Sequence, residues 1–197
     1  MKLFEAMEAI TCTLRSMWRS DGAFEIRDLG SNTALLLFDD EADVNLILMQ
    51  GPCSFDKYLI SLYKPGDDAS MDDASFNRAS FWVQIHGLPI RRMSKVTAED
   101  IGRTLGIVEH VDNSSSGDCR GKCIRVRVNI DITQPLCRGR MVNLGGQKPQ
   151  RISFQYESLP IFCYWCGLLN HDKEDCALWL RSKGSLHKDE QQYRGWM

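Results

Sequence analysis

The chain has 197 residues, a formal net charge of −2 and 43% hydrophobic residues, enough apolar side chains for one domain with an appendage or for two small modules. This charge excludes a chain that is basic throughout, and no apolar run approaches the roughly 20 residues that span a bilayer. The first 18 residues space their apolar side chains like a helix, unlike a signal peptide. We therefore expect an intracellular protein, in the nucleus rather than the cytoplasm.

Residues 1–65 are expected to form an α+β unit. Apolar residues recur at spacings of three and four from Leu3 to Met17, which predicts a helix. The elements predicted after it are two strands over 24–30 and 33–39, a helix over 41–50 and a strand over 58–64. This α-β-β-α-β order is that of an RNA-recognition-motif-like (RRM-like, ferredoxin-like) unit that lacks its first strand. The missing strand is expected to lie upstream of Met1 or to be supplied elsewhere.

The second half is expected to be rich in β-structure. A polar linker over 66–80 separates it from the first unit, and a short helix over 98–105, capped by Thr97, is its only predicted helix. The predicted strands cover 81–90, 107–111, 124–132, 140–144 and 151–157, within a β-rich region over 81–158. A zinc-binding segment over 161–178 and a tail over 179–197 complete the predicted organisation, which we class as α+β.

Charge is distributed unevenly along the chain. Residues 1–80 carry 14 acidic and 7 basic side chains, whereas residues 119–151 carry eight basic side chains against Asp131 alone. In the strand over 124–132, Arg125 and Arg127 alternate with apolar residues and so share one face. Such a face attracts a phosphate backbone. A solvated strand surface that balances the acidic first half explains the same pattern.

The segment CYWCGLLNHDKEDC, residues 163–176, has the strongest chemical signal. Cys163, Cys166, His171 and Cys176 provide three thiolates and one imidazole, the closed tetrahedral ligand set of structural zinc. The alternatives are chance spacing and a redox pair formed by Cys163 and Cys166. A closed set of four protein ligands leaves no position for a reactive water, and the chain contains no GxSxG, HExxH or phosphate-loop motif. We therefore expect zinc as the cofactor, and no enzyme activity.

The same segment resembles the CCHC-type zinc knuckle of retroviral and retrotransposon nucleic-acid-binding proteins, including the glycine after the second cysteine. The preceding runs FWVQIHGLPI, DIGRTLGIVEHVD, IRVRVNIDITQPLCRGR and FQYESLPIF are similar to plant zinc knuckle proteins. Those proteins have an N-terminal plant domain of unknown function and are found in LINE-type retrotransposon reading frames and their relatives. The run GPCSFDKYLISLYKP resembles the end of that domain. The resemblance implies zinc binding, nucleic acid binding and an RRM-like N-terminal fold.

Zinc knuckles bind single-stranded nucleic acid by stacking unpaired bases on exposed side chains while nearby cations hold the backbone. The candidate platform is Tyr164, Trp165 and Leu168. The candidate phosphate contacts are Arg125, Arg127, Arg138 and Arg140. We expect a single-stranded partner, RNA rather than DNA, with self-association possible and no membrane partner. Two alternatives stay open: Trp165 packs internally, for example against Trp179, and the zinc supports a protein interaction module.

Overall fold

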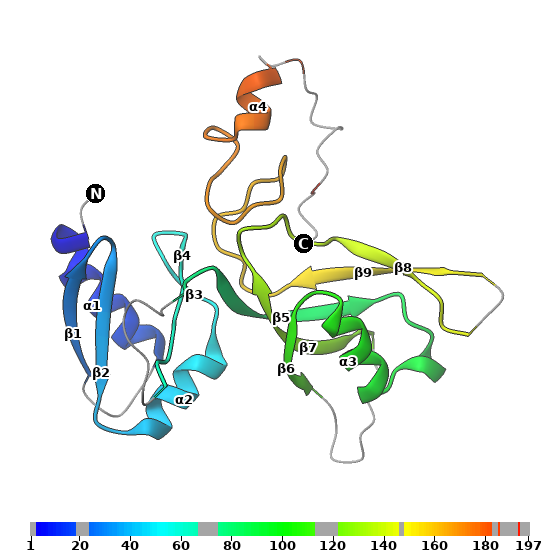
Figure 1. Cartoon of the computed structure of the whole chain (residues 1–197), viewed down its shortest axis with the longest axis horizontal. Coiled ribbons are helices and arrows are strands. Elements are labelled where there is room, and N and C mark those ends of the chain that lie inside the picture. Colours follow the sequence, from blue (N-terminus) through cyan, green and yellow to red (C-terminus); the bar gives the residue numbers. More distant parts are fainter. Residues whose placement is uncertain are drawn as a thin grey trace.

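The structure is a computed structural model that describes residues 3–18, 24–66, 75–112, 122–145 and 148–182, together with Ser185 and Tyr193. Within these ranges the chain is mixed α/β, with two two-stranded sheets and one five-stranded sheet (Figure 1). Most of the predicted linker and most of the predicted tail lie outside the described residues. No helix in the described ranges is both long and apolar enough to cross a membrane.

The first unit contains the helices and strands expected from the sequence, with one addition. Its elements are α1 (Leu3–Trp18), β1 (Phe24–Gly30), β2 (Thr33–Phe38), α2 (Glu41–Gln50), β3 (Cys53–Phe55) and β4 (Tyr58–Ile60). Ser31 and Asn32 both have positive φ, as a tight turn between right-twisted antiparallel strands requires. The Asp40 side chain accepts a hydrogen bond from the Ala42 N–H and caps α2. β3 was not expected, and β4 is shorter than the strand predicted over 58–64.

A small aromatic core holds this unit together. The ring of Phe24 lies 5.3 Å from that of Trp18 and 5.2 Å from that of Phe38, measured between centroids. The Trp18 indole N–H points at the Cys53 sulfur at 3.2 Å, which ties α1 to β3. Burial of that cysteine raises the pKa of its thiol. These contacts place both helices and the inner sides of four short strands around one cluster.

The RRM-like sheet expected for this unit is not confirmed. β1 pairs with β2, and β3 pairs with β4, but no pairing among the described residues joins the two hairpins into one sheet. The element order is therefore as predicted, while a continuous four-stranded sheet is not found in this part of the chain.

The five-stranded sheet is the larger unit. It contains β5 (Arg78–His86), β6 (Ile107–Asp112), β7 (Ile124–Asp131), β8 (Gly139–Val142) and β9 (Gln150–Tyr156), in the order β6-β7-β5-β9-β8 with antiparallel neighbours. Alternation of apolar and polar residues places one face of β5 and β7 in the core. α3 (Lys95–Arg103) packs on that face through Ala98 and Ile101.

Two predicted boundaries are corrected in this region. Ser94, not Thr97, caps α3, because its hydroxyl oxygen accepts the Thr97 N–H at 3.3 Å and the helix begins at Lys95. The polar segment predicted as a linker up to residue 80 ends earlier, because β5 begins at Arg78 and pairs there with Asp131 of β7. Each boundary depends on a residue outside the apolar run from which it was predicted: Ser94 for the helix and Asp131 for the strand.

Arg127 joins the two units. Its guanidinium donates to the backbone oxygens of Leu48 and Gly51 in the first unit and pairs with Glu109 of β6 at 3.0 Å. Only 3% of the side chain is exposed. A buried arginine must keep its donors satisfied, so this side chain fixes the first unit against the polar face of the sheet.

We expect Arg127→Ala to lower the free energy of unfolding by about 1 to 3 kcal/mol, because it leaves two carbonyl oxygens without their donor. Urea unfolding followed by circular dichroism measures this loss. Arg103→Ala is the matched control: it removes exposed ion pairs of α3 and should cost less than about 1 kcal/mol. Equal losses in the two variants would contradict the structural role of Arg127.

Candidate metal centre

The four predicted zinc ligands lie together in the structure. One ligand atom from each of Cys163, Cys166, His171 and Cys176 lies within 4.8 Å of all the others. Tetrahedral zinc with ordinary bond lengths holds sulfur and nitrogen ligands about 3.3 to 3.8 Å apart. The group therefore needs only a small contraction to enclose one ion, and its composition fits Zn²⁺.

Backbone hydrogen bonds shape the loop that contains the first two ligands. The Cys163 N–H donates to Leu168 O and the Gly167 N–H donates to Cys163 O, both at 2.9 Å. Gly167 has a φ of +84°, and a Cβ there would lie 2.3 Å from the ring of Tyr193. A residue without a side chain is required at this point, so the glycine after the second cysteine serves both the turn and the close approach of Tyr193.

The histidine is held in the orientation that metal binding requires. Its Nε2 lies 3.2 Å from the Cys166 sulfur, inside the cluster, while its Nδ1 lies 2.6 Å from Asn170 Oδ1. The asparagine oxygen can only accept, so Nδ1 carries the proton and Nε2 presents a lone pair to the ion. Such outer partners fix the tautomer of ligating histidines, and Asn170 has this function here.

The fourth ligand lies at the start of α4 (Ala177–Ser182). Burial opposes ionisation of Cys176, but the hydrogen bonds that its sulfur accepts, above all from the backbone N–H of Trp179, outweigh burial and lower the pKa of this thiol to about 7. Burial raises the pKa of the Cys163 thiol to about 12. Zinc binds thiolates, so of these two thiols Cys176 ionises the more readily, and zinc binding has to displace the proton of Cys163.

The aromatic residues of the loop differ in exposure. The Trp165 side chain is buried, and its ring stacks on Trp179 with 4.9 Å between centroids and 27° between planes. The structure therefore favours the internal packing that we kept as an alternative, and it removes Trp165 from the stacking platform. Tyr164 is 42% exposed and Leu168 is half-buried, so both remain accessible.

The two strand arginines are engaged on the polar face of the sheet. Arg125 pairs with Glu157 and Asp112, both at 2.7 Å, and lies over the Trp82 ring. Arg127 is buried at the joint between units. Both guanidinium groups are paired with carboxylates, whereas the sequence predicted that they bind phosphate. The acidic partners are 13 to 32 residues away in sequence and meet these arginines only in the folded sheet.

Arg138 and Arg140 lie on the side of the sheet opposite to Arg125 and Arg127. Arg138 directly precedes the edge strand β8 and is near the metal loop, and Arg140 belongs to β8. The Arg138 guanidinium lies over Tyr193 at 5.4 Å from the ring centroid, and Tyr193 contacts Phe162, which in turn contacts Tyr164. Arg140 is exposed and donates to Thr104 O. Neither arginine forms an ion pair with an acidic side chain among the described residues.

The sequence did not point to two residues that matter at this centre. Asn170 belongs to none of the sequence patterns described above, although an orienting acceptor for a ligating histidine can lie at a neighbouring position. Tyr193 had no spacing signal, yet its hydroxyl donates to Leu136 O at 3.0 Å and its ring covers Gly167. The metal loop is thus attached to the segment that precedes β8, where Leu136 N–H also donates to Gly167 O at 2.9 Å.

Comparison with known proteins supports this centre. Residues 130–178 match the zinc knuckle family. The chain is also 32% identical over 95 residues to an uncharacterized protein of Arabidopsis thaliana, a match that covers 48% of this chain and 30% of that protein. The chain thus spans under one third of the length of this relative. No solved structure matches the chain significantly.

We expect the purified chain to bind one Zn²⁺, and Cys176→Ala to lose it, because three ligands cannot close the tetrahedral set. Metal analysis by mass spectrometry gives the stoichiometry. Cys12→Ala is the control, since Cys12 is exposed on α1 and takes no part in the cluster. Unchanged zinc content in the Cys176 variant would contradict the ligand assignment.

Asn170→Ala should weaken zinc binding by about 10- to 100-fold, because the histidine loses the acceptor that fixes its tautomer. Competition with a chromogenic chelator measures the affinity. Lys173→Ala changes an exposed residue of the same loop and should have little effect. If both variants bind zinc as the unaltered chain does, Asn170 does not orient the ligand.

Proposed function

We propose that the chain binds single-stranded nucleic acid, RNA rather than DNA, through the zinc knuckle and the basic residues beside it. The observation that carries the proposal is the cluster of three cysteines and one histidine in a segment that matches the zinc knuckle family. The protein would act as a binding protein, not an enzyme, because four protein ligands leave the ion no open coordination position.

The arrangement around the knuckle suggests which residues would make the contacts. Tyr164 exposes an aromatic ring next to a ligating cysteine, and a base stacked on such a ring contributes about 1 to 3 kcal/mol. Arg138 is linked to Tyr164 by consecutive ring contacts through Tyr193 and Phe162. We therefore assign base stacking to Tyr164 with Leu168, and phosphate binding to Arg138 and Arg140 in place of the engaged Arg125 and Arg127.

We also infer an origin in a LINE-type retrotransposon reading frame of plants, with a nuclear location. The similarity of the runs around residues 81–110 and 124–162 to such reading frames supports this origin, and so does the Arabidopsis relative. On this view the first unit would be the N-terminal plant domain of these proteins.

A zinc-supported protein interaction module is the second candidate. It is favoured by acidic side chains in the knuckle, Asp172, Glu174 and Asp175, which repel phosphate. It is also favoured by the exposed apolar side chains of α4, Leu178 and Leu180, next to the metal loop. A contact of this kind depends on apolar area and changes little with salt.

Fluorescence anisotropy with labelled single-stranded RNA, with and without a zinc chelator, tests the proposal. Tyr164→Ala should weaken binding about 5- to 100-fold through loss of one stacked base, whereas Tyr58→Ala, an exposed tyrosine of the first unit, should not. The double change Arg138→Ala with Arg140→Ala should reduce the slope of log affinity against log salt by about 1.4, two single-strand phosphates. Arg103→Ala is the control, because it removes one exposed positive charge from α3. The change in slope is compared between the variants per charge removed.

Binding that is absent, or that persists unchanged after the zinc is removed, would contradict the proposal. Capture of an apolar peptide or protein by the Leu178 and Leu180 face, unaffected by salt and by Tyr164→Ala, would instead support the second candidate.

A further inference from the structure

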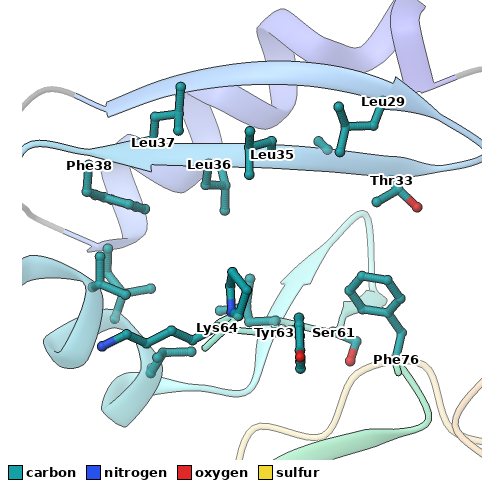
Figure 2. Close-up of a pocket in the computed structure, with 16 residues that line it drawn as sticks. Leu29, Thr33, Leu35, Leu36, Leu37, Phe38, Ser61, Tyr63, Lys64 and Phe76 are labelled. Atoms are coloured by element: carbon teal, nitrogen blue, oxygen red, sulfur yellow. The ribbon is translucent and has the colours of Figure 1, made fainter. Parts of the chain in front are cut away.

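We propose that the first unit binds an extended peptide of another chain as an inserted β-strand between β2 and residues 61–64. The inference concerns a surface distant in sequence from the zinc knuckle and does not depend on nucleic acid binding. It begins from a groove of about 400 Å³ that runs between these two segments, with α2 along it (Figure 2).

The groove is flanked by backbone that has no partner in the described chain. β2 pairs with β1 along one edge, and no described segment forms backbone hydrogen bonds along its other edge. Residues 61–64 follow Ile60, the last paired residue of β4, and likewise have no backbone hydrogen bond to a described segment. Unpaired strand edges are templates for an added strand.

The two flanks run in the same direction. Phe38 and Lys64 lie at one end of the groove, and Thr33 and Ser61 lie toward the other (Figure 2). An ion pair at 2.6 Å between Lys64 and Glu41, three residues after Phe38, closes the first end. β2 and residues 61–64, which are connected through α2 and the β3–β4 hairpin, thus flank the groove in the same direction, as the outer strands of a split β-α-β unit do. A single strand, antiparallel to both flanks, would fill the slot and join the two hairpins into one sheet.

The lining defines the side chains that fit. Leu35 and Leu37 on β2, Val44 and Leu48 on α2, and Leu62 contribute apolar surface that is partly exposed. Because strand side chains alternate between faces, an inserted strand presents every second residue to α2 and the aromatic core. Those positions must be apolar, since the groove floor adjoins Ile47 and the Trp18 cluster.

Charge at one end gives the orientation and indicates a basic end of the peptide. Asp39, Asp40 and Glu41 are exposed where β2 meets α2, and Lys64 neutralises only the last of them. A strand antiparallel to β2 begins beside Phe38, so its N-terminal residues lie against these carboxylates. The partner is therefore an extended peptide with lysine or arginine at its N-terminal end, followed by about six residues that alternate between apolar and polar, the length of β2.

The test uses the whole chain and three synthetic peptides, each with two N-terminal lysines followed by valine, isoleucine or leucine in alternation with threonine. At least one should bind with a dissociation constant below about 100 μM in fluorescence anisotropy. The same peptide, N-methylated at alternate backbone nitrogens, keeps its side chains but cannot pair with both flanks and should bind at least about tenfold more weakly. Hydrogen exchange should show new protection of amides in 33–38 and 61–64 on binding.

A matched pair of variants locates the site. Val44→Asp places a charge on the groove floor and should reduce peptide affinity at least about tenfold. Met49→Asp changes an exposed residue of the same helix that does not line the groove, and should leave affinity unchanged. The N-methylated peptide tests the unaltered protein, so the proposal remains testable if the Val44 variant does not fold.

Three outcomes would overturn the proposal. The first is failure of all three peptides at millimolar concentration, and the second is equal binding of the N-methylated peptide. The third is protection, in the chain alone, of the 61–64 amides and of those amides in 33–38 that do not bond to β1, which would mean that the edges are already paired. A dimer that Val44→Asp dissociates, with no effect of peptide, would assign the slot to a second copy of this chain instead.

Discussion

Four ligand atoms from one short segment lie within 4.8 Å of one another, and the C-terminal part of the structure depends on this proximity. The segment has little core of its own: Trp165 and the cysteine side chains pack with Trp179 in a small cluster, while Leu169 packs into the core of the large sheet. A zinc ion bound by three thiolates and an imidazole contributes about 10 to 16 kcal/mol in comparable short peptides. That contribution is large beside the hydrogen bonds of the loop, each worth about 1 kcal/mol net. The metal therefore determines whether the loop has a defined shape, and the shape determines what Tyr164 and Leu168 present to a partner.

The charged residues of the sheet illustrate why local charge does not define a binding surface. Arg125 and Arg127 belong to the most basic stretch of the sequence, yet each is paired with carboxylates from β6 or from the residue after β9. The hydrogen bond with Arg125 is the main reason that the pKa of Glu157 is lowered. Arg127 is more constrained still, since its donors are used by the carbonyl oxygens of the first unit. Of the four arginines predicted to bind phosphate, Arg138 and Arg140 are the two without an ion pair among the described residues.

Much of the local structure could be predicted from the sequence because it depends on local chemistry. Alternation gave β7, the three-and-four spacing gave α1, and ligand spacing gave the metal centre with all four residues. Pairing over long separations could not be predicted in this way: Gln84 pairs with Gln155 of β9 and its side chain donates to Glu157, 73 residues later. The same limit applies to Arg127, whose partners are 18, 76 and 79 residues away. Tyr193 was missed because a single aromatic residue after the knuckle has no period or spacing.

The first unit shows how an element order can be right while the sheet it implies is not found. The sequence predicts α-β-β-α-β, and the structure has that order, with the helices and the inner sides of the strands around one aromatic cluster. In a β-α-β-β-α-β unit the first strand lies between the third and the fourth, where it is covered by both helices and paired on both edges. In this structure the two hairpins share a core, no hydrogen-bonded pairing among the described residues joins them, and an apolar groove lies between β2 and residues 61–64. Local patterns therefore predicted each element of the unit, whereas the pairing that would join the hairpins into one sheet needs a strand between β2 and residues 61–64, which no described residue provides.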